Sequence, residues 1–315
     1  MGTSSPLFIV LNPNAAKGGA LQHRQAIENY FLSRNIEFVL ALTECRADGI
    51  RLAKEATIKG FKTIIAAGGD GTLNEIVDGI TRAIREKNLS FEEAPVVGQI
   101  PIGRGNDFAF VAKIPQKLEE ACQLILDGRW LPTDYGELFG GIFPHGRCFV
   151  NGVGIGVEPQ VNFIATDFKR ISGMLSYLVA FLKILRNFPT PMKLKVVGDN
   201  NKEQILSQQF SICNGRRMGS AFLMAPDSVI DDGLLNVVYA NRPIKKRAIL
   251  YYVLKFFAGT QLKTDRFSQF LTTQISVEAD GDVMAIHCDG EEVSRGCSSL
   301  TVKVFPKQLK VIRKM

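Results

Sequence analysis

The pattern of hydrophobic and polar residues changes near residue 135. Before this point, short apolar runs alternate with segments in which apolar residues recur every three or four positions. The apolar runs lie at residues 7–11, 36–40, 62–66, 96–100 and 130–135, and the segments between them at residues 20–33, 46–59, 73–85 and 116–126. Runs of the first kind predict strands and segments of the second kind predict amphipathic helices. Their alternation predicts a layered α/β domain with a parallel sheet.

After residue 135 the pattern is one of short segments with alternating residues, typical of antiparallel strands. Examples lie at residues 192–197, 209–213, 234–239, 274–279, 283–288 and 300–305. Asp280-Gly281 predicts a hairpin between two of these strands, and Asp289-Gly290 predicts a second turn. We therefore expect a domain at 1–135 and a C-terminal antiparallel β-sandwich at 136–305. The segment 306–315 is too short to assign and could return to the first domain.

Length and composition agree with two soluble domains. A chain of 315 residues is long for one core, and 46% hydrophobic with 22% charged residues is ordinary for a globular protein. Lysine and arginine number 38 against 31 acidic residues, and the net charge of +7 suits an anionic partner such as ATP, lipid or nucleic acid. No nucleic-acid-binding motif is recognisable, so we expect no nucleic acid partner.

The cysteines are scattered. No two of them form a C-x-x-C pair, and the chain has only three histidines. The six cysteines are Cys45, Cys122, Cys148, Cys213, Cys288 and Cys297. We exclude a zinc site and interpret the cysteines as small buried residues in a reducing compartment such as the cytosol. No secretion signal precedes the first strand, and the apolar stretches at 174–185 and 248–258 are shorter than the roughly 20 residues of a spanning helix. The sequence predicts a cytoplasmic protein.

The most informative segment, residues 64–75, reads Ile-Ile-Ala-Ala-Gly-Gly-Asp-Gly-Thr-Leu-Asn-Glu. A buried strand that stops in glycines and restarts as a helix forms a phosphate cradle, because backbone N–H groups can then approach an anion. Thr72 and Glu75 have the spacing of a capping box that would open the helix. Asp70 would repel a bare phosphate, so its presence implies a bridging Mg²⁺ or a hydrogen bond to a nucleotide. The segment predicts nucleotide triphosphate chemistry.

Two further loops of similar composition, at residues 12–19 and 101–107, follow other predicted strands. Ligands of parallel α/β sheets bind outside the carboxyl ends of the strands. We therefore expect the loops at 12–19, 68–72 and 101–107 to converge.

Six motifs occur in the following order along nearly the whole chain. They are Asn12-Pro13 with Gly18-Gly19, then Gly68 to Glu75, Pro101-Ile102-Gly103-Arg104-Gly105-Asn106-Asp107-Phe108-Ala109, Asn151-Gly152-Val153-Gly154-Ile155-Gly156, Asp231-Asp232-Gly233-Leu234, and Asp289-Gly290-Glu291. Together they resemble the bacterial diacylglycerol kinase and lipid kinase family, which is distantly related to sphingosine and ceramide kinases. NAD kinases share the Gly-Gly-Asp-Gly-Thr sequence, but this chain lacks their Gly-Ser-Thr-Ala-Tyr element. The resemblance implies a first domain like those of NAD kinases and phosphofructokinases.

The resemblance places ATP in the first domain. The residues that it implies around ATP are Thr43, Gly69, Asp70, Gly71, Thr72, Leu73, Asn74, Glu75 and Arg104. The family usually has a hydroxyl residue where this chain has Arg104, which could instead pair with a phosphate oxygen. Asp70, Asp107 and Asp134 match carboxylates that organise Mg²⁺ and water near the phosphates.

The resemblance also assigns residues of the second domain. Glu291 matches the family's proposed general base, which accepts the proton of the lipid hydroxyl as that hydroxyl attacks the γ-phosphorus. Asp70 remains an alternative base, as in sphingosine kinases. Asp232, with the backbone carbonyls of Val229 and Leu234, matches a second Mg²⁺ site of structural character.

We therefore expect an ATP- and Mg²⁺-dependent kinase of diacylglycerol or a related lipid, associated peripherally with the inner face of the membrane. A homodimer is a further possibility. For the apolar helical pattern at 171–185, core packing is the default interpretation. Partial membrane contact is an equal alternative, favoured by the aromatic residues Tyr251, Tyr252, Phe256 and Phe257 and the basic run Lys245, Lys246 and Arg247. Two alternatives remain open: an NAD kinase-like small-molecule kinase and a non-catalytic lipid or nucleotide sensor.

Overall fold

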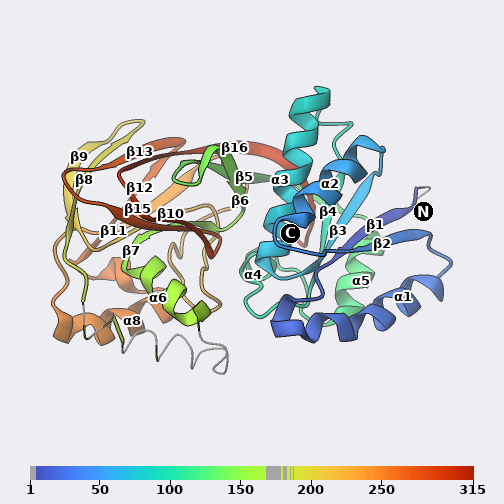
Figure 1. Cartoon of the computed structure of the whole chain (residues 1–315), viewed down its shortest axis with the longest axis horizontal. Coiled ribbons are helices and arrows are strands. Elements are labelled where there is room, and N and C mark those ends of the chain that lie inside the picture. Colours follow the sequence, from blue (N-terminus) through green and yellow to red (C-terminus); the bar gives the residue numbers. More distant parts are fainter. Residues whose placement is uncertain (1–4, 168–178, 180–182, 185, 187) are drawn as a thin grey trace. The chain divides into compact units, whose positions relative to one another are not determined.

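The computed structural model describes residues 5–167, 179, 183, 184, 186 and 188–315 (Figure 1). Contacts divide the chain into unit 1, which comprises Met1–Tyr135 with Pro306–Met315, and unit 2, which comprises Gly136–Phe305. The helical pattern noted at residues 171–185 lies almost wholly outside the described residues. None of the described helices is long and apolar enough to cross a membrane.

Unit 1 is built on a parallel sheet, as predicted. Its strands, in spatial order, are β2 (Phe38–Leu42), β1 (Leu7–Leu11), β3 (Thr63–Gly68), β4 (Val96–Pro101) and the last part of β16 (Ser299–Ile312). Leu7 lies opposite both Phe38 and Thr63, and Lys310 lies opposite Val96. Every residue of β1 is buried, which is expected of a parallel strand covered on both faces.

Helices cover both faces of this sheet (Figure 1). They are η1 (Ala15–His23), α1 (Arg24–Leu32), α2 (Asp48–Ile58), α3 (Asp70–Lys87), α4 (Asp107–Val111) and α5 (Leu118–Asp127). On one face, Gly79 lets α3 approach α2, because a Cβ at this position would lie 2.3 Å from the carbonyl oxygen of Ile50. On the other face, the hydroxyl of Tyr30 on α1 donates to Gln123 on α5 (2.9 Å).

The strand order of unit 1 reverses between β1 and β3. The chain leaves β1 for β2 on one side of the sheet and leaves β3 for β4 on the other side. In open α/β sheets, such a switch point is where ligands bind, at the carboxyl ends of the two strands. Two of the predicted loops follow these two strands.

The predicted strand at 130–135 does not extend the parallel run. It forms part of β5 (Trp130–Gly140), which pairs antiparallel with β6 (Phe143–Phe149), and β16 takes the place beside β4. The segment 306–315 thus pairs within unit 1. The backbone N–H of Lys307 donates to the buried carboxylate of Asp134 (2.6 Å), which fixes the turn where Lys307 has a positive φ of 55°.

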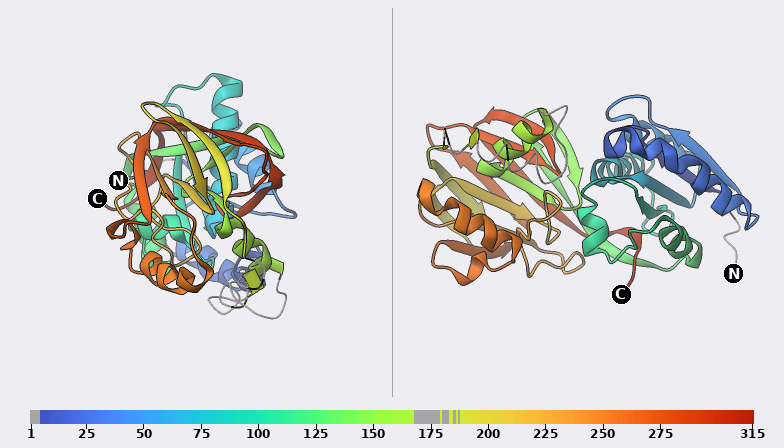
Figure 2. Two further views of the ribbon diagram at one scale, coloured as in Figure 1. Left: turned by 90° about the vertical axis from the view of Figure 1, so that its left-hand side faces the viewer. Right: turned by 90° about the horizontal axis from the view of Figure 1, so that it is seen from below.

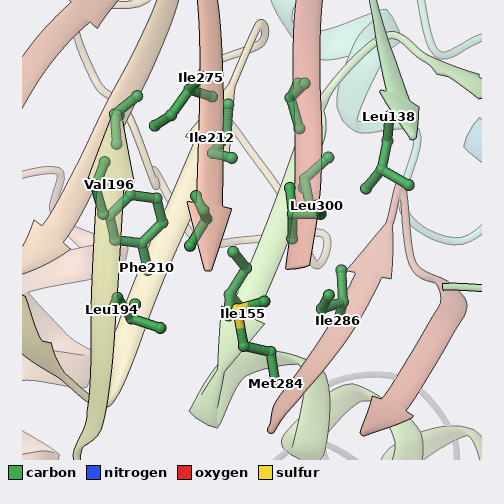
Figure 3. Packing of buried hydrophobic residues seen from close by; sticks show 14 of the residues in the cluster. Leu138, Ile155, Leu194, Val196, Phe210, Ile212, Ile275, Met284, Ile286 and Leu300 are labelled. Carbon is green, nitrogen blue, oxygen red and sulfur yellow. The ribbon is translucent and has the colours of Figure 1, made fainter. Parts of the chain in front are cut away.

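Unit 2 is an antiparallel sandwich, as predicted. One sheet contains the first part of β16, then β13 (Gln274–Ala279), β8 (Met192–Gly198) and β9 (Lys202–Ser207); the other contains β12 (Phe267–Thr272), β11 (Leu235–Ala240), β10 (Gln209–Cys213), β7 (Gly152–Gly156), β14 (Met284–Cys288) and β15 (Glu291–Cys297). Figure 3 shows apolar side chains from both sheets meeting between them, such as Val196 and Ile275 from the first and Phe210 and Ile286 from the second. These buried side chains form the core of the unit.

The hairpin predicted at Asp280-Gly281 is wrong. The strands on either side, β13 and β14, lie in different sheets and pair with other strands. Alternate residues of both strands belong to the same core, so their sequence patterns do not reveal that the strands face it from opposite sides. The turn at Asp289-Gly290 is a true hairpin turn: Cys288 pairs with Glu291, and both turn residues have positive φ (46° and 82°), as in a type I′ turn.

Helical segments also pack against unit 2. They are α6 (Val157–Asp167), η2 (Lys246–Ala248), α8 (Ile249–Phe257) and η3 (Gln261–Lys263). Figures 1 and 2 show α8 on the outer side of the second sheet, where Ile249 and Phe256 belong to a second apolar cluster.

The six cysteines are free thiols, and four are buried: Cys122, Cys148, Cys213 and Cys288. The interpretation of the cysteines as buried apolar residues is wrong for Cys45, which is exposed after β2, while Cys297 is partly exposed.

Candidate functional site

The glycines between β3 and α3 are required for different reasons. A Cβ at Gly68 would lie 2.3 Å from the hydroxyl of Thr72, so the protein's own packing requires a glycine there. A Cβ at Gly71 would meet nothing within 4 Å. Gly71 therefore leaves open space at the N-terminus of an 18-residue helix whose N-cap residue, Gly69, supplies no side-chain cap. Backbone N–H groups at such a terminus are suited to an anion, so the residues present fit a phosphate group.

The predicted capping box is wrong. The helix α3 begins at Asp70, so Thr72 lies within its first turn and not in front of it. Both carboxylate oxygens of Glu75 accept backbone N–H bonds from another helix, from Ala47 and Gly49 at the start of α2 (2.9 Å each). Glu75 thus holds the N-terminus of α2. Its contact with nucleotide stays a prediction.

Asp70 joins the glycine loop to the loop at 101–107. Its two carboxylate oxygens accept from the backbone N–H groups of Asp107 and Phe108 (2.9 Å each), at the first turn of α4. The two loops also touch directly, because a Cβ at Gly103 would lie 2.3 Å from the Cα of Gly69. The carboxylate of Asp70 therefore binds and positions the neighbouring loop, in addition to any role toward metal or nucleotide.

Asn106 shapes the loop at 101–107. It has a positive φ of 51°, and its side-chain amide donates to the carbonyls of Pro101 (2.9 Å) and Gly103 (3.1 Å) and to the side chain of Gln116 (3.1 Å). Sequence reasoning did not select this residue, although asparagine in a glycine-rich loop is a typical signal for the left-handed conformation. Arg104 lies exposed in the same loop.

The third loop joins the other two through Asn12. Its backbone N–H donates to Ala67 at the end of β3 (3.1 Å), and its side chain donates to the hydroxyl of Thr72 (3.3 Å). Thr43 is buried beside this loop, with its N–H bound to Leu11 (3.0 Å). The predicted convergence of the three loops is confirmed. Leu73 and Asn74 are buried within α3.

The three carboxylates expected near Mg²⁺ have separate partners. Asp70 and Asp107 meet at the start of α4, whereas Asp134 lies on β5 and binds Lys307. Across the part of the chain that the structure describes, no group of three or more His, Cys, Asp or Glu could hold a metal ion. A Mg²⁺ ion here would therefore take most of its oxygens from phosphates and water, as this ion commonly does.

In unit 2, Glu291 forms an ion pair with Arg147. The guanidinium Nη2 donates to Oε2 of Glu291 (2.8 Å), and Arg147 is almost fully buried on β6. The neighbouring Asp289 accepts three backbone N–H bonds, from Val150 (2.8 Å), Asn151 (3.0 Å) and Gly152 (2.8 Å). The Asp-Gly-Glu turn is thus fixed to the start of β7, and Glu291 is held in place from two directions.

A buried histidine of β14, His287, and a partly buried glutamate of α6, Glu158, lie against the glycine strand β7. His287 Nε2 and Glu158 Oε1 are 2.9 Å apart, and Nδ1 of His287 accepts from the N–H of Gly290 (3.2 Å). That bond places the imidazole proton on Nε2, facing Glu158. A Cβ at Gly154 would lie 2.5 Å from Oε2 of Glu158 and 2.6 Å from Nε2 of His287, so the packing of these side chains requires a glycine at this position.

Sequence reasoning missed Arg147, Glu158 and His287. Arg147 lies in a segment without a motif, and Glu158 and His287 each lie two residues outside the motifs at 151–156 and 289–291. The position of the buried Arg147 opposite the Asp-Gly-Glu turn depends on how the strands pair, which the sequence does not show.

Asp232 lies in an exposed loop before β11. One oxygen of its carboxylate accepts from the N–H of Leu234 (2.9 Å), which is the geometry of an Asx turn. A carboxylate beside backbone carbonyls belongs to the ligand class that Mg²⁺ prefers. The metal site at Asp232, Val229 and Leu234 stays a prediction.

Comparison with known proteins supplies the family. The family model for the diacylglycerol kinase catalytic domain matches residues 6–138, and that for the YegS C-terminal NAD kinase beta sandwich-like domain matches residues 151–313. The chain belongs to the diacylglycerol kinase and YegS lipid kinase family. Its two matched regions fall largely on unit 1 and unit 2.

This lipid kinase has similar relatives across bacteria. It is 31% identical over 238 residues to a probable lipid kinase YegS-like of Enterobacter sp. (strain 638), a match that covers 75% of each chain. It is 28% identical over 237 residues to the diacylglycerol kinase of Bacillus subtilis (strain 168), covering 74% of this chain and 73% of the relative. A crystal structure of a diacylglycerol kinase from Bacillus anthracis str. Sterne has the same fold (TM-score 0.72, 19% identity, 99% and 98% of the two chains).

Proposed function

We propose that this lipid kinase transfers the γ-phosphate of ATP to a hydroxyl of diacylglycerol or a closely related lipid, in a Mg²⁺-dependent reaction at the membrane surface. The observation that carries the nucleotide part is the open space at Gly71, at the switch point of a parallel sheet and at the N-terminus of α3. Family membership and a relative named diacylglycerol kinase support the acceptor.

The phosphates would bind to backbone N–H groups at the start of α3, and the loop at 101–107 would close over them with Arg104 as an added cation. Asp70 would hold that second loop in position through its bonds to Asp107 and Phe108. Mg²⁺, when bound, would neutralise charge on the β- and γ-phosphates near Asp70, Asp107 and Asp134. The protein's contribution here is positioning and charge.

Glu291 would accept the proton of the lipid hydroxyl as the oxygen of that hydroxyl forms a bond to the γ-phosphorus. The bond from the γ-phosphorus to the bridging oxygen breaks, and ADP leaves. We favour Glu291 over Asp70 as the base because both oxygens of Asp70 already accept backbone hydrogen bonds, whereas Arg147 binds only Oε2 of Glu291. A base of this kind contributes about 10² to 10⁴ in rate.

The test is an assay with radiolabelled ATP, Mg²⁺ and a panel of lipids in mixed micelles, with NAD in parallel. Label in the phosphorylated form of diacylglycerol is expected. Label in NAD and in no lipid would select the NAD kinase-like alternative. Binding of ATP without transfer to any acceptor would select the non-catalytic sensor.

A further inference from the structure

Helix α8 has an inner face that belongs to the core of unit 2. Phe256 packs edge-on against Phe267 (ring centroids 5.0 Å apart), as does Tyr252 (5.4 Å), and Phe257 stacks on Phe222 (4.5 Å). Three of the four aromatic residues that the sequence suggested for membrane contact therefore pack inward.

The outer face of α8 is apolar and open to solvent. Leu250, Tyr251 and Leu254 are 58%, 52% and 59% exposed. Their spacing of one and four residues puts them on one side of the helix. Large apolar side chains exposed together, and not singly, mark a surface that contacts something.

The segment that contains this helix carries basic and no acidic side chains. Residues 241–264 contain six lysines and arginines and no aspartate or glutamate: Arg242, Lys245, Lys246, Arg247, Lys255 and Lys263. Within the described part of the chain, none of these six forms an ion pair. Lys255 lies over the ring of Tyr251 (5.2 Å), and Lys245, Lys246 and Arg247 are exposed in the turn that leads into the helix.

We propose that α8 docks this protein on an anionic lipid bilayer, with Leu250, Tyr251 and Leu254 among the headgroups and acyl chains. Lys245, Lys246 and Arg247 bind the anionic headgroups around them. An amphipathic helix with apolar residues on one side and basic residues at its edge binds such surfaces through both contributions. This inference rests on the proposed function, since a diacylglycerol kinase must reach a substrate that resides in a membrane.

The charge distribution favours a bilayer over a second copy of the chain. A symmetric dimer through α8 would bring two basic runs of the same sign together, which opposes association. Three exposed side chains are also far fewer than the roughly 20 residues per partner of a stable protein interface. A bilayer supplies both apolar depth and negative charge.

Sedimentation with vesicles tests the proposal. The intact protein is compared with the Leu250→Glu, Leu254→Glu double variant, with Lys245→Gln, Lys246→Gln, and with Val283→Glu. The last is a matched control, because Val283 is also in unit 2 and 59% exposed. Binding to vesicles of phosphatidylcholine with phosphatidylserine should fall at least about tenfold in both double variants and stay unchanged in the control.

A water-soluble, short-chain diacylglycerol separates this proposal from the proposed function. Its phosphorylation should be equal in all four proteins, since α8 is not part of the proposed catalytic site. Unaltered vesicle binding by both double variants, or no vesicle binding by the intact protein, would overturn the docking role. If the intact protein is a dimer and the leucine variant is a monomer, the partner of this face is a second copy of the chain and not a bilayer. Vesicle binding without phosphorylation of any lipid would leave the docking surface intact and refute the kinase reaction.

Discussion

The guanidinium of Arg147 lies 2.8 Å from the carboxylate of Glu291, with the side chains 2% and 16% exposed. The two residues come from β6 and β15, which are far apart in sequence, and the arginine is the more deeply buried. An arginine inside a sandwich needs a carboxylate partner, and a carboxylate bound on one oxygen keeps a fixed direction. The pair holds the Glu291 side chain in a fixed direction next to a hairpin turn, which suits the proposed role of Glu291 as a base.

Glu291→Gln should lower turnover by about 10² to 10⁴, while the affinity for ATP stays nearly unchanged, because in the proposed reaction Glu291 meets the acceptor and not the nucleotide. Turnover with a lipid acceptor and ATP binding by calorimetry are measured on the same preparation. Arg147→Met is a companion variant that should destabilise the fold by about 3 kcal/mol, since it leaves Glu291 without its cation. An equal loss of ATP affinity in Glu291→Gln would refute the assigned role.

Gly71→Ala should leave the stability of unit 1 unchanged or raise it by up to about 1 kcal/mol, because alanine favours a helix and the added methyl meets no protein atom. The same methyl would occupy the space proposed for phosphate, so ATP affinity should fall at least about tenfold. Gly103→Ala is the contrast: its methyl would collide with Gly69, costing about 1 to 3 kcal/mol or more of stability. Normal ATP binding by Gly71→Ala would show that the phosphates lie elsewhere.

Asp70→Asn should weaken both nucleotide use and its dependence on Mg²⁺. An amide can replace only one of the two carboxylate oxygens that accept from Asp107 and Phe108, so the second loop loosens and stability falls by about 1 to 2 kcal/mol. KM for ATP is measured across a series of Mg²⁺ concentrations, together with unfolding in urea. An unaltered Mg²⁺ dependence would count against the assignment.

Glu75→Gln decides between two roles for this residue. Its carboxylate holds the N-terminus of α2, so the variant should lose about 1 to 3 kcal/mol of stability with ATP affinity unchanged. Urea unfolding and ATP binding give the two readings. A loss of ATP affinity with unchanged stability would instead show that Glu75 contributes to nucleotide binding.

The buried thiols predict a pH dependence of stability. Burial raises the pKa of Cys122 from 9.0 to about 12, and it raises the pKa values of Cys213 and Cys288 as well. The folded state therefore binds the Cys122 proton more tightly than the unfolded chain, a stabilisation that is complete below pH 9 and lost as pH rises toward about 12. Urea unfolding at several pH values should show that the free energy of unfolding declines less steeply with pH in Cys122→Ala; parallel curves would contradict the prediction.

In the native protein a thiol reagent should label Cys45 first, because this cysteine is exposed.

The sequence predicted those features of the site that arise from neighbouring residues. Strand, glycines and helix follow one another between β3 and α3, so the loop and its preference for an anion could be inferred locally. The partner of Asp70 could not, because the N–H groups that it binds come from a loop more than thirty residues away. The ion pair of Arg147 and Glu291 could not be predicted either, because the two residues lie on strands that are far apart in sequence, β6 and β15.

Strand pairing shows the same limit in the fold. Composition and period identified β13 and β14 correctly as strands, yet the turn between them suggested a hairpin that does not exist. Both sheets of a sandwich present the same alternating pattern to one core, so only the assembled core distinguishes them. The place of β16 beside β4 was equally hidden, because four apolar residues after Pro306 carry too little pattern to name a neighbour.

That last pairing has a consequence for how the chain is made. The edge of β4 is covered only when Lys310 and Val311 have been synthesised and have emerged from the ribosome, although its parallel partners β1, β2 and β3 are complete more than two hundred residues earlier. If unit 1 folds during translation, the edge of β4 stays unpaired until then, and an unpaired strand edge is prone to association with other chains. Nascent chains stalled before residue 306 should be the ones that chaperones retain.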